Sequence, residues 1–135
     1  MQTVITPEIK NLLNRAQQAA ETAYAPYSHF QVGAALLLAD GSVSCGCNVE
    51  NASYGATVCA ERVAVFAAVA AGKLSPAQSP QMLTVTALPC ALCLQVLAEF
   101  AKPYMPIWIV GKQGVNGGQP QHFLLKDLLP HAFKL

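Results

Sequence analysis

Hydrophobic residues near the start of the chain recur at the spacing of an α-helix. Ile9, Leu12, Leu13, Ala16, Ala20 and Ala23 fall on one face, as in a helix that packs that face against a core. Thr6-Pro7 provides a side-chain acceptor at the N-cap and a proline at the first helical position. We therefore predict a helix over residues 7–23, ended by the segment 24–28.

A β-hairpin is predicted next. Residues 30–39 form an almost continuous apolar stretch, which is typical of a buried strand. Asp40-Gly41 is a strong signal for a two-residue hairpin turn. Residues 42–49 would then return as the antiparallel partner.

The rest of the chain alternates between helical and strand patterns. The predicted elements are a helix over 59–71 ended by Gly72, a strand over 82–87, a helix over 89–101, a strand over 106–111, a turn at 116–118 and a short helix over 123–129. This order implies an α/β fold, in which helices pack on the faces of a mixed sheet.

Composition bounds the size and the partners of the protein. Its 135 residues suit one domain, 1–135. Only 11% of residues are charged and 53% are hydrophobic, against about 25% charged in typical domains, so we expect a sizeable buried interface between subunits. The net charge of +1 comes without a run of basic residues, which argues against binding to nucleic acid.

We expect a cytoplasmic protein that does not enter a membrane. Residues 1–6 lack the basic flank and apolar region of a signal peptide. The longest apolar run, 63–71, is too short to cross a bilayer. Without a secretion signal, the five cysteines are better explained as metal ligands and core thiols than as disulfides.

Two short motifs carry the candidate chemistry. Cys59-Ala-Glu61 and Pro89-Cys-Ala-Leu-Cys93 supply three thiols and one carboxylate. Three protein ligands are typical of catalytic zinc, which keeps a position for water, whereas structural zinc usually takes four. Cys90 and Cys93 are three residues apart, so they share one face of a helix and can hold one ion together with Cys59. Zinc-dependent nucleobase deaminases use this arrangement of motifs.

Glu61 and Arg62 have predicted roles beside the three thiolates. Glu61 would take a proton from the zinc-activated water and deliver it to the substrate, first as a base and then as an acid. Arg62 would donate to a ligand sulfur and offset the negative charge of three thiolates. Without Cys59 as its neighbour, Glu61 would be explained as a solvated acid at a helix start.

The other candidate residues favour structural explanations. Cys45 and Cys47 lie two apart on a predicted strand and are more simply buried thiols than ligands. The three histidines lack ligand spacing, although His29 could line a pocket, and Trp108 is most simply a core residue.

Motifs along nearly the whole chain resemble the small tetrameric cytidine deaminases that have a three-cysteine zinc site. The matching segments are Tyr24-Ala-Pro-Tyr-Ser28, Phe30-Gln-Val-Gly-Ala-Ala-Leu36, Gly46-Cys-Asn-Val-Glu-Asn-Ala-Ser-Tyr54, Cys59-Ala-Glu-Arg62 and Leu128-Leu-Pro-His-Ala-Phe133. The resemblance implies a three-layer α/β/α fold with a mixed five-stranded sheet, a homotetramer and one Zn²⁺ per subunit. It also implies hydrolysis of cytidine and 2′-deoxycytidine to uridine, 2′-deoxyuridine and ammonia, in pyrimidine salvage.

The same resemblance assigns substrate contacts. Phe30 would pack against the pyrimidine, and Asn48 and Glu50 would bind the ribose hydroxyls. Ala60 would offer backbone groups to the base. Tyr54 and Phe133 would complete a pocket across a subunit boundary.

The chain departs from the family pattern around its second motif. Ala91 stands where the family usually has glycine, Leu94 stands where it usually has arginine, and the loop before Pro89 is shorter than in relatives. The loss of that arginine would leave more charge compensation to Arg62. A shorter loop would widen the pocket near the leaving group, so one hypothesis is activity on N4-acyl or N4-alkyl cytidines. A shortening of the loop that has no effect on function is an equally good explanation.

Three further functions compete with deamination of cytidine. The same chemistry could act on another amino-heterocycle. Editing of tRNA or DNA is disfavoured, because basic patches are missing and the first ligand is a cysteine, where tRNA-editing relatives usually have histidine. A zinc-stabilised scaffold without catalysis would need a fourth ligand, which Cys45 or Cys47 would have to supply.

Overall fold

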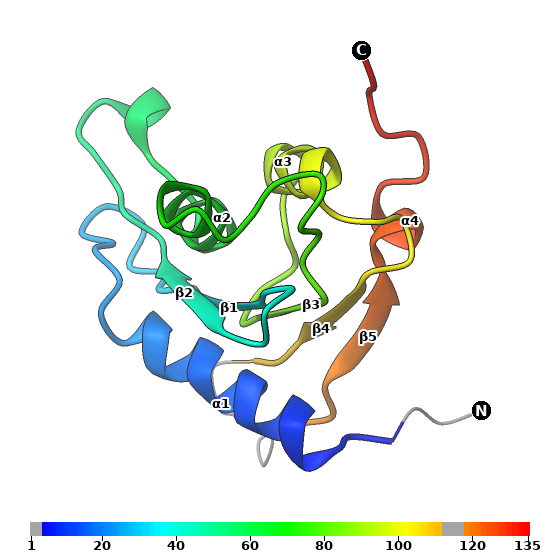
Figure 1. The fold of residues 1–135 in the computed structure, drawn as a ribbon. Helices are drawn as coiled ribbons and strands as arrows, with labels where there is room; N and C mark the ends of the chain where they lie inside the picture. Colours follow the sequence, from blue (N-terminus) through cyan, green and yellow to red (C-terminus); the bar gives the residue numbers. More distant parts are fainter. Residues whose placement is uncertain (1–3, 112–117) are drawn as a thin grey trace.

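A mixed five-stranded sheet forms the middle layer of the protein (Figure 1). The computed structural model describes residues 4–111 and 118–135. Along the sheet the strand order is β2-β1-β3-β4-β5. β1 is antiparallel to both β2 and β3, β3 is parallel to β4, and β4 is antiparallel to β5. The strands are β1 (Gly33–Leu37), β2 (Val43–Cys47), β3 (Met82–Val85), β4 (Pro106–Ile109) and β5 (Gln121–Leu124).

Helices cover both faces of the sheet, which confirms the predicted three-layer α/β/α fold. Helix α1 (Pro7–Ala20) lies on one face, and α2 (Ala60–Ala70) and α3 (Ala91–Phe100) lie together on the other (Figure 1). The short α4 (Leu125–Leu128) follows β5, and a single 3₁₀ turn, η1 (Tyr54–Ala56), precedes α2. No helix among residues 4–111 and 118–135 is long and apolar enough to cross a membrane.

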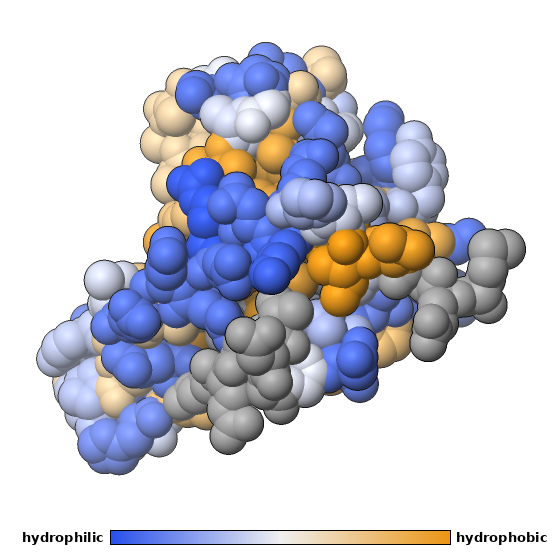
Figure 2. All heavy atoms as spheres, turned by 90° about the horizontal axis from the view of Figure 1, so that it is seen from below, coloured by the Kyte–Doolittle hydropathy of each residue, from blue (hydrophilic) through white to orange (hydrophobic). Residues whose placement is uncertain are grey.

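Helix α1 begins as its sequence predicts. The Thr6 hydroxyl accepts the N–H of Ile9 at 3.2 Å, and Pro7 occupies the first helical position. The buried face contains Ile9, Leu12, Leu13, Ala16 and Ala20. The buried Thr84 hydroxyl ties the helix to β3 by donating to the Leu12 carbonyl at 2.8 Å. The outward surface on the α1 side is largely hydrophilic (Figure 2), as expected of an amphipathic helix.

The larger core lies between the sheet and the helices α2 and α3. It contains the inward side chains of β1, β3 and β4 together with those of the two helices. A second, smaller cluster under α1 includes Trp108. This side chain is only 3% exposed, which confirms the prediction that Trp108 is a core residue. The two helices that carry the cysteine motifs are therefore anchored along their apolar faces, and their N-termini are held in place.

The hairpin forms where it was predicted, but its turn is one residue longer. Gly41 N–H donates to the Leu38 carbonyl at 3.0 Å, and Leu38 N–H donates to the Ser42 carbonyl at 2.8 Å, so residues 39–41 form the loop. Gly41 adopts a φ of 87°. This is the three-residue hairpin with a left-handed glycine. The Asp40 carboxylate stabilises it by accepting the N–H and the hydroxyl of Ser42, and these bonds lower the pKa of Asp40.

The predicted short helix over 123–129 is partly wrong. Phe123 and Leu124 belong to β5, which pairs Trp108 with His122 and Ile107 with Phe123, and the helix begins only at Leu125. Four residues of strand are too short to produce a clear period in the sequence. The turn predicted at 116–118 lies largely outside the described residues. The other predicted elements are present with slightly shorter bounds.

Candidate metal centre and active site

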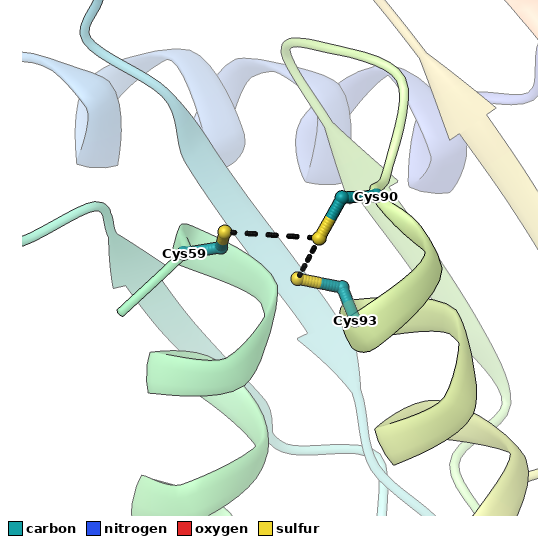
Figure 3. A group of neighbouring side chains, drawn as sticks. All are labelled: Cys59, Cys90 and Cys93. Atoms are coloured by element: carbon teal, nitrogen blue, oxygen red, sulfur yellow. Dashed lines mark hydrogen bonds between the residues drawn. The ribbon is translucent and has the colours of Figure 1, made fainter. Parts of the chain in front are cut away.

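Three cysteine side chains meet where the N-termini of α2 and α3 converge. Cys59 is the N-cap of α2 and Cys90 is the N-cap of α3, while Cys93 lies in the first turn of α3. The three thiols point toward one another (Figure 3). The Sγ atoms of Cys59 and Cys90 are 4.0 Å apart, and those of Cys90 and Cys93 are 3.5 Å apart. The structure thus brings the predicted ligands together across 31 residues of sequence.

The sulfur triangle has the size that zinc requires. All three sulfurs lie within 4.8 Å of one another. A tetrahedral Zn²⁺ with Zn–S bonds of about 2.3 Å places its sulfurs about 3.8 Å apart, which falls between the two sulfur distances given above. Among the described residues, the group contains no fourth His, Cys, Asp or Glu ligand. A site of three ligands is the pattern of catalytic zinc.

Cys45 and Cys47 do not approach the three cysteines. They lie on β2, the edge strand of the sheet, next to Gly46, which packs against α2. Because neighbouring strand residues point to opposite faces, both thiols face away from α2. Cys45 is exposed and Cys47 is partly exposed. The prediction that both are buried thiols is therefore wrong, most clearly for Cys45, because an edge strand leaves part of its outer face uncovered.

Arg62 supplies positive charge beside the thiols, as predicted. Its Nη2 donates to the Cys59 sulfur at 3.4 Å. The hydrogen bond to Cys59 is the main cause of a raised pKa for Arg62. Burial alone would raise the pKa of Cys90, but hydrogen bonds from the backbone and side chain of Cys93 lower it overall. Burial raises the pKa of Cys93, and the nearby Glu61 charge adds to this effect.

Glu61 is a buried carboxyl directly beside the metal cluster. It is only 4% exposed, and burial is the largest cause of its raised pKa. A hydrogen bond with the Cys93 side chain opposes this shift. A carboxyl whose pKa is raised toward neutrality is suited to accept a proton and return it during one reaction cycle.

A cavity of about 300 Å³ opens onto Glu61, Cys59 and Cys90. Its walls come from the segments 28–32 and 48–50, the start of α2 and the loop before α3. The lining residues are Ser28, Phe30, Val32, Asn48, Glu50, Thr57, Cys59, Ala60, Glu61, Ala87, Leu88 and Cys90. The cavity therefore gathers the predicted catalytic group, two predicted ligands and four predicted substrate contacts in one place.

Asn48 and Glu50 are both fixed by hydrogen bonds to the segment 27–32. The Asn48 side chain accepts the N–H of Val32 at 2.8 Å and donates to the Phe30 carbonyl at 2.9 Å. An amide has two N–H donors and two oxygen lone pairs, so these bonds leave capacity for a ligand. Glu50 accepts the backbone N–H of Tyr27 at 2.9 Å and that of Ser28 at 3.1 Å. The Ser28 hydroxyl also donates to Glu50.

Tyr54 and Phe133 do not line the cavity of their own chain. Tyr54 is 79% exposed and packs edge-on against Tyr27, with ring centroids 6.2 Å apart. Phe133 is 68% exposed. Its backbone is held by Gln95, whose amide donates to the Phe133 carbonyl and accepts its N–H, both at 3.0 Å. Both rings are thus presented outward, as a contact with a second subunit would require.

Sequence reasoning missed three residues of this site. Ser28 lies within the segment 24–28, whose sequence indicates only the end of a helix and a family match. Leu88 lines the cavity although it is 65% exposed. Gln95 follows the second motif by two residues, and only its contact with the C-terminal tail gives it a role. His29, which the sequence left as a possible pocket residue, is not among the residues of this cavity.

Two of the departures have different structural consequences. Ala91 is exposed at the start of α3. Leu94 is 6% exposed and packs in the main core with residues of α2 and β3. An apolar side chain is therefore well accommodated at position 94, and Arg62 provides positive charge next to the cysteines.

Comparisons with known proteins agree with this site. Residues 6–108 match the family described as "Cytidine and deoxycytidylate deaminase zinc-binding region". The chain is 40% identical over 132 residues to a cytidine deaminase of Sporosarcina psychrophila, covering 93% of this chain and 91% of that protein. It is 44% identical over 128 residues to one of Halalkalibacterium halodurans, covering 90% and 91%.

A solved structure shows the same fold. The crystal structure of a cytidine deaminase from Burkholderia pseudomallei superimposes with a TM-score of 0.82 at 42% identity, covering 95% of this chain and 99% of that one. The overall fold is thus shared with a protein of related sequence.

Proposed function

The chain belongs to the cytidine and deoxycytidylate deaminase family, whose members bind zinc and act as hydrolases, and we propose that its substrates are cytidine and 2′-deoxycytidine. Water would replace the amino group of the pyrimidine and release ammonia, giving uridine or 2′-deoxyuridine. The observation that carries the proposal is the position of Glu61, which is buried next to three converging thiols at one end of a nucleoside-sized cavity.

Cys59, Cys90 and Cys93 are the proposed ligands of the zinc cofactor. When bound, zinc supplies a Lewis acid that activates water for attack on an amino-bearing ring carbon. Glu61 takes one proton from the attacking water and delivers it to the adjacent ring nitrogen; it then takes the second proton, from the hydroxyl that has added to the ring carbon, and passes it to the departing amine. Arg62, which donates to the Cys59 sulfur at 3.4 Å, would offset the negative charge of the three thiolate ligands.

The cavity supports the proposed substrate contacts. Phe30 would pack against the pyrimidine ring, and backbone groups at Ala60 would bind the base beside the metal. Asn48 and Glu50 would bind the ribose hydroxyls at the other end, where both side chains already have fixed positions. Both side chains keep hydrogen-bonding capacity beyond these bonds, so the site would favour a ligand with matching hydroxyls.

We further propose that the 135-residue domain assembles as a homotetramer in the cytoplasm and works in pyrimidine salvage. Large apolar side chains are exposed on the side of α2 and α3, including Phe66, Val69 and Leu92. The outward surface of α1 is mostly hydrophilic (Figure 2). Burial of the α2–α3 side between subunits would also bring Tyr54 and Phe133 against neighbouring chains.

The decisive experiment compares Glu61→Gln with the wild-type protein. We expect ammonia release from cytidine to fall by at least a thousandfold, with zinc content unchanged, because glutamine cannot carry the proton. Glu99→Gln makes the same substitution at an exposed glutamate of α3. This variant is the matched control and should keep full activity. Unchanged activity of Glu61→Gln would contradict the proposed role of Glu61, and absence of ammonia release from both zinc-loaded proteins would favour a zinc-stabilised scaffold instead.

A second candidate substrate class is the N4-substituted cytidines. It is favoured by Leu88, which lines the cavity from the loop between β3 and α3 and is largely exposed. The loop is short, since β3 ends at Val85 and α3 begins at Ala91. An acyl or alkyl group on the amino nitrogen would extend past Leu88 toward solvent.

The test is turnover of N4-acetylcytidine and N4-methylcytidine, detected by product mass. We expect uridine together with acetamide or methylamine. Leu88→Trp should reduce turnover of both substituted compounds more than that of cytidine. If the wild-type protein converts neither compound, the loop shortening has no such effect on substrate range.

A further inference from the structure

The hydroxyl of Ser28 connects two residues of the cavity wall. It donates to one carboxylate oxygen of Glu50 and accepts the backbone N–H of Phe30 at 3.0 Å. A serine hydroxyl has one donor and two acceptor positions, so it can make both bonds at once. Ser28, Phe30 and Glu50 all line the cavity. One small side chain therefore links a carboxylate and an aromatic residue that face the same ligand space.

The backbone around Ser28 is shaped to allow this double contact. His29 has a φ of 58°, the single positive value among non-glycine residues of the described chain. Its N–H closes a turn by donating to the Ala25 carbonyl at 3.0 Å. The left-handed conformation is costly for a residue with a Cβ, and such strain clusters at functional sites. Here it reverses the chain so that the Phe30 N–H returns to the Ser28 hydroxyl.

The carboxylate of Glu50 is consequently held at both oxygens. One oxygen accepts two backbone N–H groups, from Tyr27 and Ser28, and the other accepts the Ser28 hydroxyl. A carboxylate has about four lone-pair positions in total. The three bonds leave room for one more donor, and the orientation they impose decides from which direction that donor must come. Hydrogen bonds to the charged form also keep the pKa of Glu50 low, chiefly that from Ser28.

We propose that Ser28 is a positioning residue for recognition of the sugar: it holds Glu50 so that the free position on the carboxylate accepts a ribose hydroxyl, and it holds Phe30 beside it. This rests on the proposed function, since it presupposes a nucleoside in the cavity. Ser28 acts through Glu50 and Phe30 and makes no bond to the reacting atoms. Its contribution should therefore appear in substrate affinity and depend on the sugar.

The experiment uses Ser28→Ala in the zinc-loaded, full-length protein, with four substrates: cytidine, 2′-deoxycytidine, 3′-deoxycytidine and 2′,3′-dideoxycytidine. For cytidine we expect KM to rise about tenfold, as for loss of one hydrogen bond to a charged group, with kcat within twofold of wild type. For 2′,3′-dideoxycytidine we expect no change in KM, because no hydroxyl remains for Glu50 to accept. The two monodeoxy substrates identify which hydroxyl is recognised.

Two variants serve as references. Ser28→Thr keeps the hydroxyl and should restore most of the affinity for cytidine. Ser79→Ala removes a hydroxyl from the segment between α2 and β3, away from the cavity, and should have no effect on any substrate. A thermal melt of each variant separates a change in stability from a change in recognition.

The outcomes are distinct. An equal rise in KM for all four substrates would show that Ser28 only maintains the local fold, and the proposal would be wrong. No rise in KM for cytidine would show that the Ser28 hydroxyl is dispensable, and the proposal would again be wrong. If the wild-type protein deaminates none of the four nucleosides, the proposed function itself fails, and the sugar-recognition role falls with it.

Discussion

Gly46 is the residue whose substitution should best reveal how the sheet positions the metal site. It lies on β2, directly under the first turns of α2. A Cβ at this position would lie 2.4 Å from the Ala60 carbonyl oxygen and 2.6 Å from the Ala64 nitrogen. Both are backbone atoms, so no side-chain rotation can relieve the contact.

The size of the effect follows from these distances. Ordinary van der Waals contact begins at about 3.4 Å, so α2 and β2 must separate by about 1 Å. Overpacking of this kind costs about 1–3 kcal/mol of folding free energy. The first turn of α2 carries Glu61 and Arg62, and Cys59 is its N-cap. A misplacement of about 1 Å in catalytic geometry can reduce the rate about a hundredfold.

We therefore expect Gly46→Ala to lower the Tm by several degrees and kcat/KM for cytidine by about a hundredfold per zinc-loaded subunit. The assay is the loss of cytidine absorbance at a temperature well below the Tm, normalised to bound zinc. Cys45→Ala is the matched control, because the adjacent side chain points to the other face and is exposed. Wild-type kcat/KM in a folded Gly46→Ala protein would refute the reasoning.

Three further predictions concern the charge, the tail and the pH dependence of the site. Arg62→Gln should lower kcat/KM about 10–100-fold and speed the loss of zinc to a chelator, followed with a chromogenic indicator. Gln95→Leu should release the tail at Phe133, seen as faster proteolytic cleavage near the C-terminus, and raise KM with zinc content unchanged. Because hydrogen bonds hold the pKa of Glu50 below its ordinary 4.5, the carboxylate stays charged as pH falls from 7 to about 5. KM should therefore stay flat over that range and rise only below it, and a rise near pH 6 would contradict this assignment.

Hydrogen bonds fix the C-terminal tail against the helix that carries the second cysteine motif. It lies against α3, the helix that carries Cys90 and Cys93, and is held there by two side chains. The Gln95 side chain binds both the carbonyl and the N–H of Phe133. The Lys134 ammonium donates to the Ala98 carbonyl at 3.1 Å. These bonds fix the backbone of the tail and leave the Phe133 ring exposed. The proposed contact with a neighbouring subunit would thus begin from an ordered tail.

The sequence by itself determined the features that depend on local chemistry. The helix 7–20 follows from an N-cap, a proline and a period of 3.6, all within one segment. The proposed metal ligands follow from the types and spacing of three cysteines, because few other residue sets could produce a three-thiolate site beside a carboxylate. Family resemblance added the fifth strand and the outline of the pocket.

Only the tertiary structure decided the features that depend on distant contacts. β5 forms because residues 121–124 pair with β4, and four residues carry too little pattern to predict that pairing. Cys45 is exposed because β2 lies at the edge of the sheet. The sequence of β2 does not indicate that position. The hydrogen bonds of Ser28 to Glu50 and of Gln95 to Phe133 join residues 22 and 38 positions apart. Such contacts arise when packed elements bring remote groups together, and no local preference of either residue specifies its partner.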